Sequence, residues 1–473
     1  MKHRPVLLAC VALGLSACPG PGADDDGGDA GPGITMGPGG PTTDDPTEGP
    51  ITADGTTAPG TAGVTSSPAS DSSMPDSSGG FEPPKFDTND MPDGGNGGGC
   101  NCGGEDTGWS YIWVANSNES TVSKIDTVTL VEEGRYSTDP ASNGNPSRTS
   151  VNLTADAVAV ANRNGGVVKV WARPELCDPM RNGMAGLQTS NSSVALPFAQ
   201  DDCIAWHTDF PSYTTQRPVA WTSGVQNPVT CEYEDTAVWT SGCNTGAGGD
   251  VWVHLLDGET GISLQDVQVP GFICSGFGAY GGAVDSNNDF WISSNSAASM
   301  IARIRLSDFS TETVAAPHQA YGIAIDAMDR VWLTINNVSS STDAAQRYDP
   351  ATSTWDLAMG TTVKGYSGIQ EGTDGRMWLN NGFGGSIGLI SIDRDTLVVG
   401  PQIPIPGAVS WLNGISIDPD GNVWTVSPSA NSVFRYDPGT GAIDSYNGLD
   451  FPYTYSDMTG SGLLNSTCGS PVG

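Results

Sequence analysis

The sequence predicts an all-β fold, a seven-bladed β-propeller closed by a C-terminal strand. A short apolar stretch, a turn rich in Asp, Asn and Gly, and a second apolar stretch recur seven times along the chain. The second stretch carries an anchor residue, usually Trp, and successive anchors are 47, 79, 52, 41, 46 and 46 residues apart. One small sheet cannot bury both of its faces, so a repeat of this length is typical of propeller blades that stack on one another.

The repeat has three clear copies and four looser ones. The clear copies begin at Tyr280 (YGGAVDSNNDFWIS), Tyr321 (YGIAIDAMDRVWL) and Asn413 (NGISIDPDGNVWTV). The seven anchors are Trp113, Val160, Trp239, Trp291, Trp332, Trp378 and Trp424. Each copy predicts two antiparallel strands joined by a tight turn, because Asp, Asn and Gly are the residues that tight hairpins need.

Residues 1–18 are predicted to be a lipoprotein signal peptide. Two basic residues precede an apolar run from Val6 to Leu15, which ends in the sequence LSAC at Cys18. Small residues directly before a Cys are typical of the bacterial lipobox, whose Cys becomes the lipid-modified N-terminus. We expect lipid at Cys18, with an ordinary secretory signal as the alternative. Pro19, where inner-membrane retention favours Asp, indicates the outer membrane or cell surface.

Residues 19–99 are predicted to be a disordered acidic tether. The segment consists mainly of Gly, Pro, Asp, Thr and Ser, with fourteen carboxylates and a single Lys. Low hydrophobicity and charge of one sign keep such a segment from forming a core. The folded domain is therefore expected at residues 100–473.

The folded part is acidic. It keeps 39 acidic and 16 basic residues, a formal charge near −23. Binding to nucleic acid or to anionic lipid headgroups needs basic patches, so neither is an expected partner. Contact with a membrane is expected through the lipid anchor only.

The cysteines indicate disulfides in an exported protein. Ten Cys residues become eight in the mature folded part, because one leaves with the signal and one takes lipid, and an even number is typical of a disulfide framework. The spacing favours pairing Cys177 with Cys203, Cys231 with Cys243, and Cys102 or Cys100 with Cys468.

The first blade lacks an inner strand in the sequence before it. Its second strand is expected at Tyr111–Ala115, directly after Gly-rich linker. The C-terminal sequence YSDMTGSGLL, from Tyr455, matches YSGIQEGTDG, from Tyr366. We therefore expect the C-terminal segment to supply the missing strand, which leaves no open sheet edge at the join.

The widest anchor spacing predicts an insertion at about residues 172–230. This stretch contains two Cys, several Pro and several aromatic residues. Long loops braced by disulfides often carry binding specificity.

The phrases PDGNVW and YGIAID resemble the repeats of the virginiamycin B lyase family and of NHL-type propellers, from about residue 109 to the end. The resemblance implies a seven-bladed propeller. It also implies magnesium-assisted elimination at an ester of a cyclic depsipeptide, with a His base and carboxylates that hold the metal. The base would be His318, with Tyr321 and Asp457 nearby. No His and Glu pair occurs at short spacing, so no metal ligand is identified, and Mg²⁺ is expected only if the protein is a lyase.

The connections that enter the inner strands should line one mouth of the central channel, and the residues there are mostly aromatic. Aromatic side chains supply a large contact area with few rotors to immobilise. The alternative is that these rings simply fill the channel. The candidate ligand-binding residues are Arg148, Tyr280, Tyr366, Trp411, Asn413 and Tyr455.

We therefore expect a lipid-anchored extracytoplasmic propeller that binds a glycan, a peptide or a protein, at the outer membrane or cell surface. The alternative is a carbon–oxygen lyase of the virginiamycin B lyase type, and a third possibility is a structural envelope protein. An enzyme of this type would need magnesium and His318, whereas a binding module would need neither.

Overall fold

The computed structural model describes residues 100, 102, 110–336, 343–359, 367–381 and 387–469. These residues all belong to one compact unit, Pro83–Gly473. The predicted signal, the lipid site Cys18 and the tether lie outside the described residues, as does Tyr366.

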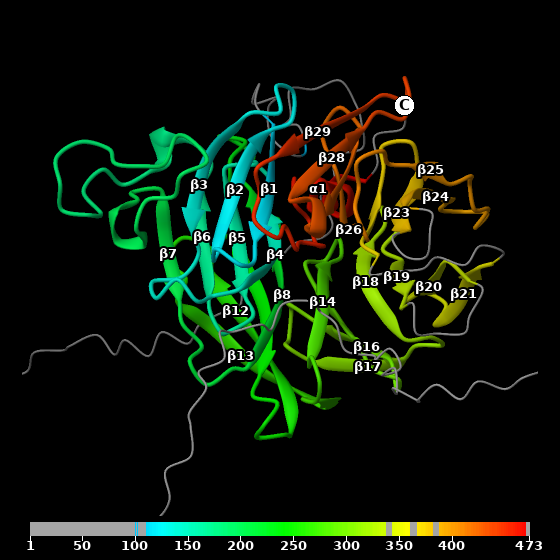
Figure 1. The fold of residues 1–473 in the computed structure, drawn as a ribbon. Helices are drawn as coiled ribbons and strands as arrows, with labels where there is room; N and C mark the ends of the chain where they lie inside the picture. The colour runs from blue at the N-terminus through cyan, green and yellow to red at the C-terminus, as the bar shows by residue number, and fades with distance from the viewer. Residues whose placement is uncertain are drawn as a thin grey trace, which may run out of the picture. The chain divides into compact units, whose positions relative to one another are not determined.

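Seven antiparallel sheets are arranged as the blades of a propeller (Figure 1). Six blades have four strands and the first has three, while β9 (Val225–Gln226) and β10 (Tyr233–Glu234) form a separate small hairpin. The predicted all-β, seven-bladed fold is confirmed.

Each of the six four-stranded blades starts at an inner strand, and neighbouring inner strands contact one another. The inner strands are β4 (Pro146–Val151), β8 (Thr215–Trp221), β14 (Ala279–Val284), β18 (Ala320–Ile325), β22 (Ile369–Glu371) and β26 (Asn413–Ile417). The second strands are β1 (Tyr111–Asn116), β5 (Ala157–Asn162), β11 (Ala237–Cys243), β15 (Phe290–Ser294), β19 (Val331–Ile335), β23 (Arg376–Asn381) and β27 (Val423–Ser427). All seven predicted anchors lie in these second strands.

In the six four-stranded blades the outermost strand is more exposed than the two inner strands. The third strands are β2 (Thr121–Asp126), β6 (Val167–Trp171), β12 (Asp250–Asp257), β16 (Met300–Ile304), β20 (Ala345–Asp349), β24 (Gly388–Asp393) and β28 (Ser432–Tyr436). The fourth strands are β3 (Glu132–Ser137), β7 (Ile204–Thr208), β13 (Ser263–Ile273), β17 (Thr311–Ala315), β21 (Thr354–Ala358), β25 (Ile403–Pro404) and β29 (Ile443–Asn447).

Neighbouring inner strands lie so close together that they need Gly where they touch. A Cβ atom on Gly322 would lie 2.5 Å from the carbonyl oxygen of Ser367. A Cβ atom on Gly368 would lie 2.5 Å from the backbone nitrogen of Ile415. Any side chain would push the strands apart, which explains the Gly that follows the first residue of the repeat phrase.

The Asp of the repeat joins the hairpin turn to the anchor Trp. In the seventh blade, the buried Asp418 carboxylate accepts two backbone N–H bonds within its own turn and a bond from the indole N–H of Trp424, at 2.8 Å. The same arrangement occurs in two further pairs, Asp285–Trp291 and Asp326–Trp332. These acids therefore stabilise the blades and lie away from the channel mouth.

The C-terminal segment completes the first blade. The backbone N–H of Trp113 donates to the carbonyl of Met458 at 2.9 Å, and the N–H of Tyr453 donates to the carbonyl of Ala115 at 3.1 Å. Residues 451–458 thus pair with β1 where the other blades have an inner strand. Beside this join, apolar residues of β1 and β27 share one core cluster, and Figure 1 shows β1 to β3 next to β28 and β29.

The chain beyond this segment differs from the prediction. Residues 461–464 were expected to continue the strand, but Ser461–Cys468 forms the helix α1. The Asp457 carboxylate accepts N–H bonds from Gly460 at 2.9 Å and from Leu463 at 3.2 Å, so it satisfies donors at the start of the helix. The helix contacts β14, β18, β22 and β26 and therefore covers one end of the channel. In the part of the chain that the structure describes, no helix is suited by length and apolar character to cross a membrane.

Four disulfides are present, and they indicate an extracytoplasmic location. Two of the expected pairs occur, Cys177–Cys203 and Cys102–Cys468. The expected bond between Cys231 and Cys243 is wrong, since these residues bond to Cys100 and Cys274 respectively. Cys243 is the last residue of the seven-residue strand β11, and Cys231 comes before that strand begins. The length of the extended strand therefore keeps the two cysteines too far apart for a disulfide.

The predicted insertion also needs a correction. Residues 172–230 are not one loop, because they include β7, the outer strand of the second blade, and β8, the inner strand of the third. The extra length forms two loops instead. One lies between β6 and β7 and holds the Cys177–Cys203 bond, and the other carries β9 and β10.

We predict that ending the chain at Asp450 prevents folding. The shortened chain would lose the backbone bonds to β1, the helix α1 and the Cys102–Cys468 bond, which leaves an unpaired strand edge that favours aggregation. Size-exclusion chromatography and thermal unfolding of the purified chain would check this. A monomer with an unchanged melting temperature would contradict the closure described above.

We predict a pH-dependent effect of the Asp285→Asn substitution. Burial, together with the charge of Asp289, raises the pKa of Asp285 to about 6 from a usual value of 3.8. Because the folded state holds this proton more tightly, the group stabilises the fold at low pH, and this contribution is lost as the pH rises from about 4 to about 6. Asn does not titrate, so the stability of the variant relative to the natural chain should rise over this range, by at most about 3 kcal/mol. Its one side-chain oxygen can accept from the turn N–H groups or from Trp291 but not from both, which adds a constant, pH-independent loss.

Unfolding measured at several pH values for both chains gives this difference directly. The matched control is Asp308→Asn, because local hydrogen bonds from Ser310 lower the pKa of that exposed carboxyl. The control difference should have the opposite sign. A constant difference for Asp285→Asn across the range would contradict the prediction.

Candidate functional site

The inner strands bring seven aromatic side chains together at the channel mouth. Tyr280 and Tyr321 are the second residues of β14 and β18, and Trp411 lies just before β26. Tyr453 and Tyr455 come from the C-terminal segment, and these five residues form one buried cluster. The partly buried Phe277 and Phe451 pack against it. We call these seven residues the mouth cluster.

Hydrogen bonds and ring contacts join the residues of the mouth cluster to one another. The hydroxyl of Tyr453 lies 2.5 Å from that of Tyr321 and 3.3 Å from that of Tyr280. The rings of Tyr280 and Tyr455 stack with their centroids 5.4 Å apart. The five core rings are at most 9% exposed. In this structure the rings therefore fill the mouth, which was the alternative to an open aromatic site.

Arginine side chains lie among these rings. Arg148, the third residue of β4, is fully buried and donates hydrogen bonds to the carbonyl oxygens of Tyr280 at 2.7 Å and of Ser147 at 3.1 Å. Its guanidinium lies over the rings of Tyr455 and Tyr280. Burial, with a smaller contribution from the positive charge of Arg217, lowers the pKa of Arg148 to about 9. Ring faces favour a cation, so the tyrosines partly offset the burial of this charge.

Two further arginines, which the sequence analysis missed, also lie against the mouth cluster. The Arg217 guanidinium is 5.1 Å from the ring centroid of Tyr280, and that of Arg163 is 4.3 Å from the ring centroid of Tyr453. Arg217 is the third residue of its inner strand, as Arg148 is in the preceding blade. Aligning the two inner strands would have identified it.

The sequence analysis also missed three aromatic residues of the mouth cluster, Phe277, Phe451 and Tyr453. The Tyr453 hydroxyl contacts the hydroxyls of both Tyr321 and Tyr280, whereas the prediction included only Tyr455 from this segment. In the sequence FPYTYSD, aromatic residues at 451, 453 and 455 alternate with small ones. Side chains two positions apart in an extended segment point to the same side, so this alternation was the signal.

The three residues expected to be catalytic have separate surroundings. The His318 imidazole faces Asp343, with Nε2 3.4 Å from a carboxylate oxygen. The Tyr321 hydroxyl belongs to the mouth cluster. The Asp457 carboxylate bonds to the start of α1 and to the Gln370 side chain, at 3.3 Å. The structure therefore does not join the predicted base, tyrosine and acid into one site.

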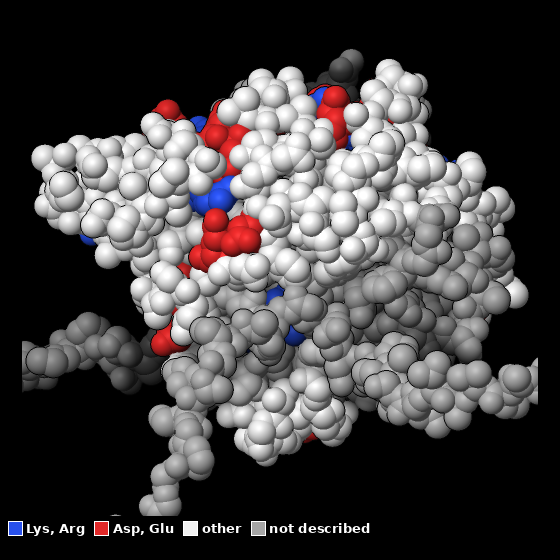
Figure 2. Space-filling view, viewed as in Figure 1, with Lys and Arg blue, Asp and Glu red and all other residues white. Residues whose placement is uncertain are grey.

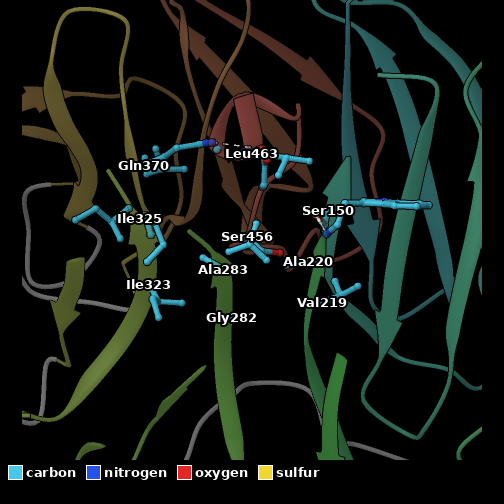
Figure 3. A pocket seen from close by; sticks show the side chains of 17 residues that line it. Ser150, Val219, Ala220, Gly282, Ala283, Ile323, Ile325, Gln370, Ser456 and Leu463 are labelled. Atoms are coloured by element: carbon cyan, nitrogen blue, oxygen red, sulfur yellow. Dashed lines mark hydrogen bonds between the residues drawn. The ribbon is translucent and has the colours of Figure 1, made fainter. Parts of the chain in front are cut away.

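Asp457 lies beside a small cavity next to α1. The cavity has a volume of about 50 Å³, which is room for a few water molecules. Most of its lining is apolar, and Figure 3 shows Ile323 and Ile325 of β18, Val219 of β8 and Leu463 of α1 around it. Burial raises the pKa of Asp457. The cavity is too small for an organic ligand, so the channel mouth remains the candidate site.

The mouth does not fit the magnesium ion that the lyase resemblance implies. A magnesium site needs carboxylate and water oxygens, whereas the groups that meet at the mouth are guanidinium ions and phenols. Among the described residues, no group of three His, Cys, Asp or Glu side chains is placed to hold a metal ion. A base and metal constellation of the lyase type is not formed by the residues that the sequence analysis proposed.

No protein-family model and no curated protein matches the chain. Among solved structures, a streptogramin B lyase is similar, with 14% identity, a TM-score of 0.45 and coverage of 67% of this chain and 89% of that one. A catalytically inactive virginiamycin B lyase from Staphylococcus aureus, solved with quinupristin, has 15% identity, a TM-score of 0.44 and coverage of 72% and 88%. A functionally unknown protein from Desulfotomaculum acetoxidans has 10% identity, a TM-score of 0.49 and coverage of 72% and 96%. The structural neighbours are thus virginiamycin B lyases and other β-propellers, and at these identities the likeness concerns the fold alone.

Proposed function

We propose that this protein is an extracytoplasmic binding module that takes a glycan, peptide or protein ligand at the mouth of its propeller. The observation that carries the proposal is the mouth cluster with its three arginines. Tyr, Trp and Arg are the residues that most often dominate binding energy, and here they gather at one place on a rigid ring. Trp411, with Phe277 and Phe451 beside it, is the part of the cluster nearest to solvent.

The proposal includes attachment to the outer membrane or cell surface through lipid on Cys18. The four disulfides support an exported protein, and the lipobox sequence at Cys18 supports the anchor. Intact-mass analysis of the chain purified from bacterial membranes should show a mature N-terminus at Cys18 carrying acyl groups. A chain that begins elsewhere or lacks acyl mass would refute the anchor.

The proposal does not include nucleic acid or anionic lipid headgroups as partners of the outer surface. On the face shown in Figure 2, basic side chains are few and do not form a patch. Nucleic-acid binding depends on such patches. The formal charge of the whole chain, −34, also disfavours binding to nucleic acid, which is itself negatively charged.

We predict that Trp411→Ala weakens binding about tenfold or more, because it removes the most exposed large ring of the mouth cluster core. Binding would be measured on arrays of bacterial surface glycans and peptides, and then by fluorescence titration with the best binder. The matched control is Trp252→Ala, since Trp252 lies on β12 in the outer half of a blade and is 39% exposed. Equal binding by both variants would move the ligand site away from the mouth.

A turnover assay separates this proposal from lyase activity. The full chain would be incubated with a cyclic depsipeptide ester, with and without magnesium, beside the His318→Ala variant. We expect no metal-dependent cleavage. Cleavage that needs magnesium and disappears in the variant would make the protein an enzyme of the lyase type.

A further inference from the structure

Three buried side chains at the channel mouth have polar atoms without a hydrogen-bond partner in the described part of the chain. These atoms are Nε of Arg148, Oη of Tyr455 and Nδ2 of Asn413. The three residues are at most 4% exposed. Protein interiors pair nearly all of their buried polar groups, so a local group of unpaired atoms indicates a missing partner. Guanidinium and amide nitrogens only donate, and a phenol can donate, so the missing partner is a hydrogen-bond acceptor.

The three residues are neighbours. The Arg148 guanidinium lies over the Tyr455 ring. Asn413 precedes Gly414, whose backbone packs against Thr454 and Tyr455, so closely that a Cβ on Gly414 would overlap the Thr454 carbonyl. The segment that carries Asn413 thus adjoins the backbone of Tyr455, whose ring covers the Arg148 guanidinium.

The local charge is positive. Arg148 bonds to two backbone carbonyls and two ring faces, and no ion pair in the described residues includes it. Arg217 lies against the same Tyr280 ring, 5.1 Å from its centroid, as Arg148 does at 5.0 Å. A buried charge without a counterion is costly, and contacts with ring faces offset only part of that cost. An anion would complete this arrangement.

We propose that the mouth binds a carboxylate of the ligand on Arg148, with Tyr455 as a cover that moves aside. The planar fork of a guanidinium matches the two oxygens of a carboxylate, which accounts for the frequency of Arg at such sites. Tyr455 and Asn413 would donate the remaining hydrogen bonds. This inference rests on the proposed binding function and adds the charge of the group that enters the mouth.

Tyr455 is suited to move because its hydroxyl is not held by a hydrogen bond and its segment is irregular. Residues 451–458 pair with β1 through a few backbone bonds and a single bridge, Asn116–Pro452, and do not form a strand of their own. Arg148 itself is fully buried in this structure, so a ligand reaches it only when the cover opens. The overall negative charge of the domain does not oppose this at short range, since exposed charges are screened beyond about 8–10 Å.

The test is thermal unfolding of the purified full-length mature chain with acetate, D-glucuronate or phosphate, and with D-glucose as the neutral comparison, at constant ionic strength. At least one oxyanion should raise the melting temperature with saturation, by about 2 °C at a tenfold excess over its dissociation constant. D-glucose should have no such effect. No response to any of the three oxyanions would overturn the proposal.

The decisive variant is Arg148→Met. The variant should lose the response to oxyanions. Without ligand it should melt at a higher temperature than the natural chain, because the substitution replaces a buried charge that has no counterion with an apolar side chain of similar volume. The matched control is Arg305→Gln, at a partly exposed arginine that pairs with Glu312, and it should keep the response. An Arg148→Met chain that is less stable and responds normally would show that Arg148 is only structural.

A second pair of variants applies if Arg148→Met does not fold. Tyr455→Phe and Asn413→Ala each remove one of the proposed donors and keep the charge, so each should weaken the response several-fold. A normal response in both would overturn the site. If D-glucose stabilises the protein as strongly as D-glucuronate does, the charge inference fails while the proposed binding function still holds.

Discussion

The close approach of neighbouring inner strands is the constraint on which the rest of this structure depends. Where the strands touch, only Gly fits, as at Gly322 and Gly368. Among the described residues, the side chains that point inward fill most of the centre of this narrow ring and leave a small cavity beside α1. The result is a rigid centre with two different ends. Rings and arginines occupy one end, and α1 covers the other.

The same constraint determines the chemistry of the candidate site. Tyr280 and Tyr321 each precede a glycine of an inner strand and pack together in the mouth, and Arg148 and Arg217, the third residues of two other inner strands, lie against the Tyr280 ring. Guanidinium groups and phenols placed in a small, dry volume make a site rich in donors and poor in carboxylates. Such a site suits recognition of an acceptor and does not suit a hard cation.

Closure of the ring links the two ends of the folded domain. Residues 451–458 take the place of an inner strand, and the Cys102–Cys468 bond joins residues 366 positions apart. The segment that closes the ring also supplies Tyr453 and Tyr455 to the mouth cluster. Closure of the ring and the proposed binding therefore involve the same few residues, and the Tyr455 hydroxyl has no hydrogen-bond partner among the described residues.

The sequence by itself determined the blade number, the strands that carry the anchors, the structural role of the turn carboxylates and the aromatic nature of the mouth. All of these follow from short-range patterns, in which alternation and turn residues repeat at each blade. Only the tertiary structure decided the partners of Cys231 and Cys243, the division of the predicted insertion by β7 and β8, and the helix at 461–468. It also placed His318 and Asp457 in separate surroundings and brought Arg163, Arg217 and Tyr453 to the mouth. These features depend on which residues of different blades meet in space, and that is set by the packing of the inner strands around the ring rather than by any local pattern.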